Sequence, residues 1–216
     1  MTTDVSLGVF GLLTPARIPT TTTTTSSGTS VNQTTQGMSS AAGALGVFHQ
    51  QFAPWLGYNV NFGYSRSTEN YSIGNSYTPI GSLAPTNSSF QHGSIGTNVY
   101  ELSITSVVQG PRTKRFSTFA QVGGGGLFFL PTQRPGPTSE QTRPALVFGT
   151  GINYKLTDHL AMRAEYRGLF YKSPDFVAQG ALPVSRLFTV TSEPTMSLVY
   201  TFGGGKKKAK LAKGMQ

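Results

Sequence analysis

The charged residues Arg163, Glu165 and Arg167 stand two positions apart in a stretch rich in apolar and aromatic side chains. In an extended strand this spacing points all three side chains to the same face. Glu101 and Lys155 occupy comparable positions in two other stretches. Buried charges persist only when they are paired and hydrogen-bonded, so we predict that these five residues form one interior charge network, with Glu101 reaching Arg167. Such a network is either a gate that admits ions or a static plug of salt bridges.

The histidines do not form a recognisable catalytic pattern. His49, His92 and His159 are scattered along the chain, and neither His49 nor His92 has an acidic partner at a spacing useful for a Ser–His–acid arrangement. The run Gly123–Gly126 lacks the lysine and the helix of a phosphate-binding loop. The chain has no cysteine, and no spacing typical of metal ligands is present. We therefore predict no catalytic residue, no metal site and no cofactor.

The element that must position these charges is a β-strand, and residues 56–67 (LGYNVNFGYSRS) show the pattern. Large apolar and aromatic side chains alternate there with Gly, Asn and Ser, a period of two that predicts a strand rather than a helix. Seven further stretches qualify as strands. The eight predicted strands cover residues 4–13, 39–50, 56–67, 98–108, 116–130, 145–156, 160–172 and 195–202.

The connections between these strands alternate in length. We predict four long polar loops at residues 14–37, 68–96, 131–143 and 173–193, and three short turns at residues 51–55, 109–115 and 157–159. The Thr-rich first loop is expected to be mobile, because its composition cannot bury a core. The alternation places all long loops at one end of the sheet. The short turns and both termini lie at the other end.

The composition indicates which face of the sheet is inside. Charged residues make up 12% of the chain, about half the ~25% of soluble proteins. The polar faces carry mainly small residues, which suits a narrow, filled interior, and the apolar faces suit a lipid-facing belt. Backbone groups in lipid must all be paired, so the sheet must close into a barrel. Because eight strands leave an interior just wide enough for side chains, the plug is favoured over the gate.

The sequence of residues 148–172 (FGTGINYKLTDHLAMRAEYRGLFYK) resembles the last strands of the OmpA-like or small-porin family of outer-membrane β-barrels. The Tyr–x–Phe ending of TMSLVYTF is similar to the C-terminal assembly signal of that family, which implies this role for Tyr200 and Phe202. The resemblance covers residues 4–202 and implies an eight-stranded antiparallel up-and-down transmembrane barrel that is assembled by the barrel assembly machinery in the bacterial outer membrane. Unlike many relatives, the chain carries no C-terminal peptidoglycan-binding domain, and fourteen residues follow Phe202.

The basic character of the chain is concentrated in its last residues. The net charge is +9, but five of the seventeen basic residues lie in residues 203–216, leaving 12 basic and 8 acidic residues in residues 1–202. We therefore predict a barrel domain (residues 1–202) followed by a disordered Gly/Lys-rich tail, and no nucleic-acid partner. The tail is either a solvated end or a segment that binds peptidoglycan or anionic lipid. Its lysines are Lys206, Lys207, Lys208, Lys210 and Lys213.

These patterns predict a non-enzymatic outer-membrane protein with a structural or surface-interaction role and weak small-solute passage, most simply a monomer in contact with outer-membrane lipids. The polar loops are either adhesive surfaces or solvated caps. A soluble or periplasmic lipocalin-like ligand-binding barrel is the alternative, and a lipid-modifying outer-membrane enzyme is the third interpretation. Residues 1–14 show no signal peptide, and Asp4 occupies the place of its basic region. We therefore expect either a mature form with an added Met or a true start upstream.

Overall fold

The computed structural model describes residues 2–15, 20–25, 27–132, 140–174 and 188–202. The regular structure of these residues consists of ten β-strands. They are β1 (Thr2–Leu12), β2 (Thr20–Thr25), β3 (Gly28–Met38), β4 (Ala41–Ala53), β5 (Leu56–Pro79), β6 (Asn87–Arg112), β7 (Phe116–Pro131), β8 (Gln141–Lys155), β9 (Leu160–Lys172) and β10 (Phe188–Phe202). The described residues include no helix that is long and apolar enough to cross a membrane.

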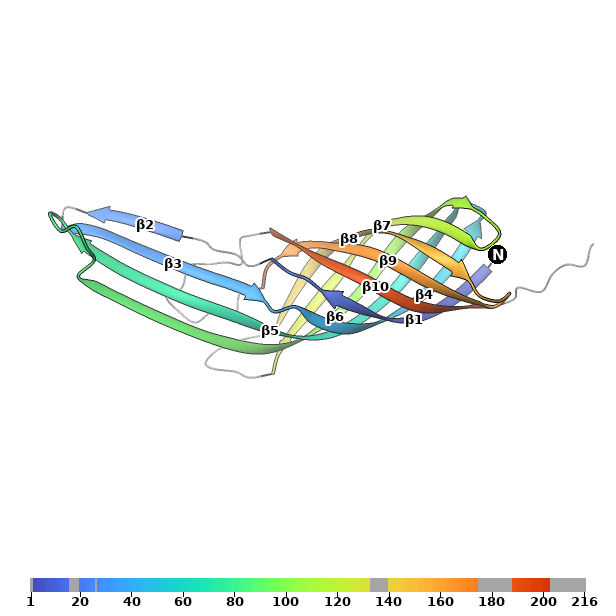
Figure 1. Cartoon of the computed structure of the whole chain (residues 1–216), viewed down its shortest axis with the longest axis horizontal. Helices are drawn as coiled ribbons and strands as arrows, with labels where there is room; N and C mark the ends of the chain where they lie inside the picture. Colours follow the sequence, from blue (N-terminus) through green and yellow to red (C-terminus); the bar gives the residue numbers. More distant parts are fainter. Residues whose placement is uncertain (1, 16–19, 26, 133–139, 175–187, 203–216) are drawn as a thin grey trace, which may run out of the picture.

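Eight of these strands form a closed antiparallel ring, which confirms the predicted up-and-down barrel. The ring runs in the order β1, β4, β5, β6, β7, β8, β9 and β10, and β10 returns to pair with β1. The short connections after β4, β6 and β8 lie at the end of the barrel that also holds the N-terminus (Figure 1). Closure leaves no open edge within the ring, so backbone donors and acceptors find partners in neighbouring strands.

The outside of the ring carries the apolar face of each strand. Leu7, Ile104 and Tyr166 are 71%, 60% and 56% exposed, whereas their inward-facing neighbours Thr105 and Arg167 are buried. A closed sheet with exposed apolar side chains around it fits a bilayer rather than water. The lipocalin-like alternative requires the reverse arrangement, and the structure does not favour it.

The interior has two layers, of which the sequence predicted only one. The half near the short turns is polar, as expected from residues such as Asn59 and Asn61. The half toward the other end contains a cluster of apolar side chains beside buried polar residues such as Ser65, Ser67 and Thr97, which corrects the prediction of a polar interior throughout. In six strands of the ring (β1, β4, β6, β7, β8 and β9) apolar residues occupy both faces there, so these strands fill the lumen as well as coating the outside. The apolar interior cluster contains Phe10, Leu12, Met38, Leu45, Val47, Ile95, Val99, Leu127, Phe129, Ala145, Val147, Leu169 and Tyr171.

A four-stranded sheet extends beyond the barrel and corrects two of the predicted loops. Residues 14–37 and 68–96 were expected to be loops, but β2, β3 and the distal halves of β5 and β6 pair there in a regular sheet. We call this sheet, made of β2, β3, residues 69–79 and residues 87–95, the arm. It continues along the long axis of the molecule away from the short turns (Figure 1). The central parts of the third and fourth predicted loops fall in residues 133–139 and 175–187, outside the described residues.

Local chemistry explains why the arm is β-structure. In residues 69–79 the side chains of Tyr71, Ile73 and Tyr77 alternate with small polar residues, and aromatic and β-branched residues favour strands. The turn between β5 and β6 contains Gly81 at a φ of 81°, a left-handed conformation that glycine adopts without steric cost. At the base of the arm, Ser39 donates its backbone N–H to Thr68 O at 2.7 Å and accepts the Thr68 N–H on Oγ at 3.0 Å. Ser39 therefore fixes the chain to β5 where the barrel becomes the arm.

Candidate functional site inside the barrel

A single guanidinium group lies at the centre of the barrel. Arg167 on β9 is completely buried and contacts carboxylates from three strands. It forms an ion pair and a hydrogen bond with Glu101 on β6, its Nη1 lies 3.1 Å from Glu193 Oε2 on β10, and its Nε lies 3.7 Å from Glu165 Oε1 on β9. We call Arg167 and these three glutamates the hub. Because β6 and β9 are not neighbours in the sheet, the Arg167–Glu101 contact joins opposite sides of the lumen.

Glycines facing the interior make room for the hub. A Cβ on Gly63 would lie 3.2 Å from both Cβ and Oε2 of Glu101, and one on Gly149 would lie 3.3 Å from Cα and Cγ of Arg167. These distances are tighter than ordinary van der Waals contact, so the long charged side chains fit because the opposing strand has no side chain there. Gly123 and Gly125 allow the backbones of β7 and β6 to approach closely, since a Cβ on these glycines would lie 2.0 Å and 2.3 Å from carbonyl oxygens of β6.

A chain of hydrogen bonds runs from the hub toward the short turns. The Gln121 amide donates to Glu165 Oε1 and accepts on Oε1 from the Asn59 amide at 2.8 Å and from Thr105 Oγ1 at 2.8 Å. His49 Nδ1 lies 2.7 Å from Asn59 Oδ1. Glu101 Oε1 also accepts from Ser103 Oγ at 2.7 Å. The half of the interior near the short turns is therefore filled by a connected network of polar side chains, because buried polar groups require hydrogen-bond partners.

The electrostatics of the hub are unbalanced. Three carboxylates face one guanidinium, and removing charges from water is costly unless each is paired. The second interior cation, Arg163, lies nearer the short turns. Its Nε donates to Asn153 Oδ1 at 2.8 Å, and its guanidinium carbon lies 4.9 Å from the centre of the Phe119 ring. Arg167 is therefore the cation that all three carboxylates share, which makes it the residue on which the arrangement depends.

The apolar interior cluster seals the lumen on the side of the arm. Among the described residues, a cavity of about 10 Å³ lies between the hub residues Glu101 and Glu193 and the apolar side chains on the arm side, including Phe129 and Leu169. A cavity of this size holds at most one water molecule. The inward-facing apolar residues therefore pack against one another and do not line a ligand cavity of the lipocalin kind.

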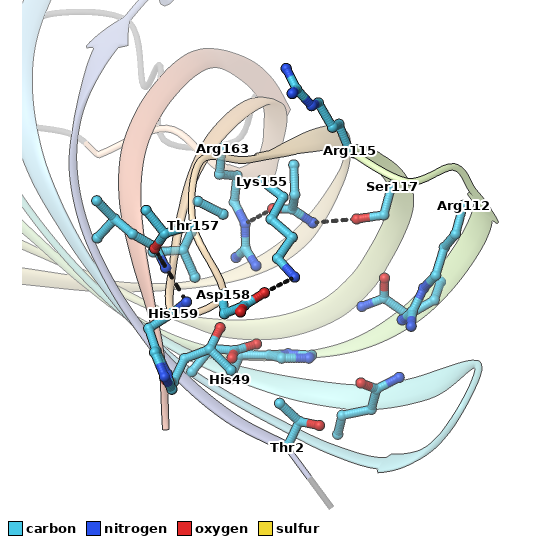
Figure 2. A pocket seen from close by; sticks show the side chains of 18 residues that line it. Thr2, His49, Arg112, Arg115, Ser117, Lys155, Thr157, Asp158, His159 and Arg163 are labelled. Atoms are coloured by element: carbon cyan, nitrogen blue, oxygen red, sulfur yellow. Dashed lines mark hydrogen bonds and ion pairs between the residues drawn. The ribbon is translucent and has the colours of Figure 1, made fainter. Parts of the chain in front are cut away.

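A larger polar pocket of about 280 Å³ opens at the end of the barrel with the short turns. Figure 2 shows the side chains that line it, with Arg163 on one wall and His49 on another. Lys155 lies here, not in the interior network as predicted. Its Nζ is 2.9 Å from Asp158 Oδ1 in the adjacent turn, and its side chain is half exposed. The last position of β8 projects into the mouth of the barrel, which explains the misplacement.

The structure thus brings together four of the five predicted network residues along one lumen. Glu101, Glu165 and Arg167 lie in the hub, and Arg163 lies between the hub and the short turns. Sequence reasoning missed Glu193, Gln121 and Asn59. Glu193 was assigned to the end of the fourth loop, although an extension of the last strand past Pro194 through residues 187–191 was compatible with the sequence; in the structure β10 does extend past the proline, and Glu193, Thr195 and Ser197 are buried at alternate positions.

The remaining predicted residues lie elsewhere. Tyr200 and Phe202 project from the outer face of β10, about half exposed, with their ring centres 5.0 Å apart. The tail lysines fall in residues 203–216, outside the described residues. In the part of the chain that the structure describes, no group of three or more acidic, histidine or cysteine side chains is placed to hold a metal ion.

The closed ring, the apolar belt and the filled polar lumen define the class of this protein, which is an integral outer-membrane β-barrel. The sequence profile of the OmpA-like transmembrane domain matches residues 20–205, and the chain belongs to this family. The chain is therefore placed in the bacterial outer membrane. No curated protein matches the sequence significantly.

Three solved structures illustrate what this chain is similar to at low sequence identity. The outer-membrane protein OprG from Pseudomonas aeruginosa is 12% identical, with 93% of this chain and 95% of that chain covered and a TM-score of 0.54. Neisserial surface protein A is 12% identical, with 92% and 96% covered and a TM-score of 0.49. The attachment invasion locus protein Ail of Yersinia pestis is 11% identical, with 93% and 98% covered and a TM-score of 0.43.

Proposed function

We propose that this protein is a non-enzymatic surface-interaction protein, in which a plugged outer-membrane barrel anchors the arm outside the cell. The observation that carries the proposal is the length of β5 and β6, which have 24 and 26 residues. A tilted transmembrane strand needs about 9–11 residues. More than half of each strand is therefore available to extend beyond the hydrocarbon layer, and the arm is a continuation of the barrel itself.

The sealed lumen supports an anchoring role. Arg167 joins opposite sides of the barrel, and the apolar interior cluster lies on its arm side, so the interior stabilises the barrel as a core does.

The environment of the three histidines supports the absence of enzymatic activity. Within the described residues, none of them is hydrogen-bonded to both a serine and an acid. His49 pairs with Asn59, and the His92 ring lies 6.2 Å from the Phe90 ring on the arm.

The display of the arm can be tested by cysteine labelling, because the natural chain contains no cysteine. Leu83 lies fully exposed in the turn at the tip of the arm, and Trp55 lies exposed in a short turn at the opposite end. We expect Leu83→Cys to react with a membrane-impermeant maleimide on intact cells and Trp55→Cys to react only after the outer membrane is opened. The reverse labelling pattern would contradict the proposal.

Passage of small solutes is a second candidate function, favoured by the pocket at the mouth and by the polar chain that leads from His49 to Glu165. Passage through the lumen requires that the hub separates. We expect the wild type to show little steady conductance in planar bilayers. Arg167→Ala, which removes the group that joins the two sides, should conduct more. Equal conductance of the two proteins would show that the hub does not control passage.

The place of each segment in the barrel indicates the partner that we propose for it. The apolar belt contacts outer-membrane lipids, and Tyr200 and Phe202 at the end of β10 would be read by the barrel assembly machinery. The tail begins at the end of the barrel that carries the short turns, because it follows Phe202. There its lysines would meet peptidoglycan carboxylates or anionic lipid. The interior-sealed barrel needs no second subunit to complete its sheet, which supports a monomer within its own membrane.

A further inference from the structure

One edge of the arm has backbone hydrogen-bonding groups that no other strand of the described residues uses. In β6, residues 88–95 pair with β5 on one side, and the pairing of β6 with β7 begins only at Thr97 and Pro131. Gly96 O accepts the Thr132 N–H at 2.8 Å on the β7 side. Because strand residues direct their backbone groups alternately to the two sides, the even-numbered residues point to this edge. No strand in the described part of the chain pairs with Ser88, Phe90, His92 or Ser94 on that side.

This edge lacks the features that normally protect edge strands. Natural proteins use charged side chains, prolines, bulges or very short strands to prevent pairing with another chain. Residues 86–96 contain no Asp, Glu, Lys, Arg or Pro. The β5–β6 register runs from Leu56 to Tyr77 without an irregularity, so the edge is also free of bulges. The edge is therefore competent to accept a further strand.

The sequence of the edge is complementary to itself in an antiparallel arrangement. If Gln91 lies opposite Gln91 of a second copy, Phe90 lies opposite His92 and Ser88 lies opposite Ser94. These are the residues whose backbone groups face the edge, and they fall in hydrogen-bonded pairs. Phe90 is 70% exposed, and aromatic pairs across strands stabilise a sheet. No charge repels the second copy at any of these positions.

The orientation of the arm determines where the second copy must be. Copies in one membrane point their arms in the same direction, since the arm continues the long axis of the barrel (Figure 1). Antiparallel pairing of two β6 edges requires arms that point toward each other. We propose that the arm binds the arm of a second copy of this chain in an apposed outer membrane, edge to edge through residues 88–95. This inference rests on the proposed display of the arm and specifies its partner.

Vesicle clustering tests the proposal. Two populations of proteoliposomes, labelled with different fluorescent lipids, are mixed and their association is followed by energy transfer and light scattering. We expect clustering with the wild type and with His92→Ala, which keeps the backbone N–H. His92→Pro removes one outward donor while leaving the β5 side intact, because proline is tolerated at an edge. It should slow clustering about tenfold, as expected for losing symmetry-related hydrogen bonds. Equal clustering of His92→Pro and His92→Ala would overturn the proposal.

Disulfide trapping tests the register. Gln91 opposite itself is a non-hydrogen-bonded pair, where the close Cα distance suits a disulfide. We expect Gln91→Cys to form dimers after oxidation of mixed vesicles, and Thr22→Cys on the edge strand β2 to form none. Dimers of Thr22→Cys alone, or Gln91→Cys dimers that form equally in vesicles kept apart by dilution, would overturn the proposal. If Leu83→Cys is labelled on intact cells but wild-type vesicles do not cluster, the pairing inference fails while display of the arm stands.

Discussion

Arg167 on β9 is ion-paired with Glu101 on β6, although the two strands are separated in the ring by β7 and β8. The contact therefore crosses the lumen, and its partners are both buried. Glu165 and Glu193 approach the same guanidinium from β9 and β10. One cation thus links three elements of the barrel at a single level.

Replacing Arg167 with Met should destabilise the barrel by about 3–5 kcal/mol, because three buried carboxylates lose their partner. Urea unfolding in lipid vesicles, followed by tryptophan fluorescence, measures the free energy of unfolding. Adding Glu101→Gln to Arg167→Met should recover part of the loss by removing one uncompensated charge. The exposed Arg115 provides the control, since Arg115→Met should change stability by no more than about 0.5 kcal/mol. A loss below about 1 kcal/mol in Arg167→Met would show that the hub is not required for stability.

Two adjacent glycines should respond differently to the same substitution. A Cβ on Gly123 would lie 2.0 Å from Ile104 O, whereas the nearest atom to a Cβ on Gly124 is 3.5 Å away. Gly123→Ala must displace the backbone of β6 and should cost about 1–3 kcal/mol. Gly124→Ala should be neutral or stabilising by up to about 1 kcal/mol, since alanine restricts the unfolded chain. Similar unfolding free energies for the two variants would contradict the close approach of β6 and β7.

The pairing of β1 with β10 is interrupted at Pro194. The register runs to Phe10 and Thr195 and resumes at the bridge between Leu13 and Ser192. The same register places Gly11 opposite Pro194, which has no N–H to donate. Pro194→Thr restores the donor and should stabilise the barrel by about 0.5–1.5 kcal/mol. Slower amide exchange at Thr195 and Met196 would accompany the gain. Unchanged exchange and stability would show that the interruption has another cause.

Removing residues 203–216 tests the proposed role of the tail. Five lysines near an anionic surface contribute roughly 1 kcal/mol each at low ionic strength. The truncated barrel should therefore bind peptidoglycan sacculi or added anionic vesicles far more weakly than the full chain, and the difference should shrink as salt is raised. A chain with the five lysines changed to Gln is the matched control for length. Equal, salt-independent binding of all three proteins would indicate a solvated end.

The barrel could be predicted from sequence because its outer face is apolar in every strand. Alternation in residues 56–67 identifies the lipid-facing side, and Arg163, Glu165 and Arg167 share the opposite face for the same reason. The arm could not be predicted in this way. Residues 71–79 are mostly half-buried, and Asn75 interrupts the series of large side chains at odd positions, so the strong contrast between an apolar and a polar face that marks the barrel strands is missing there.

The interior charge network could be predicted only in part, because Glu193 lies beside a proline and Lys155 lies at the end of its strand. Glu193 lies next to a proline that normally ends a strand, but β10 continues past Pro194 because its pairing with β9 is unbroken there. Lys155 follows the alternation of β8, yet the strand ends there and the side chain reaches Asp158. The apolar interior cluster could not be predicted, because periodicity within one strand does not show that residues of several strands, such as Phe10 and Leu45, meet at the same height in the lumen.

The continuity of β5 and β6 from the barrel to the tip of the arm has a mechanical consequence. A pull on the arm directed away from the membrane acts along these strands and loads their many cross-strand hydrogen bonds together, in shear. A hairpin pulled apart from its open end would instead break its bonds one after another. The arm is therefore built as a stiff tether, in which tension applied at its tip is carried directly into the part of the protein that is held by the bilayer.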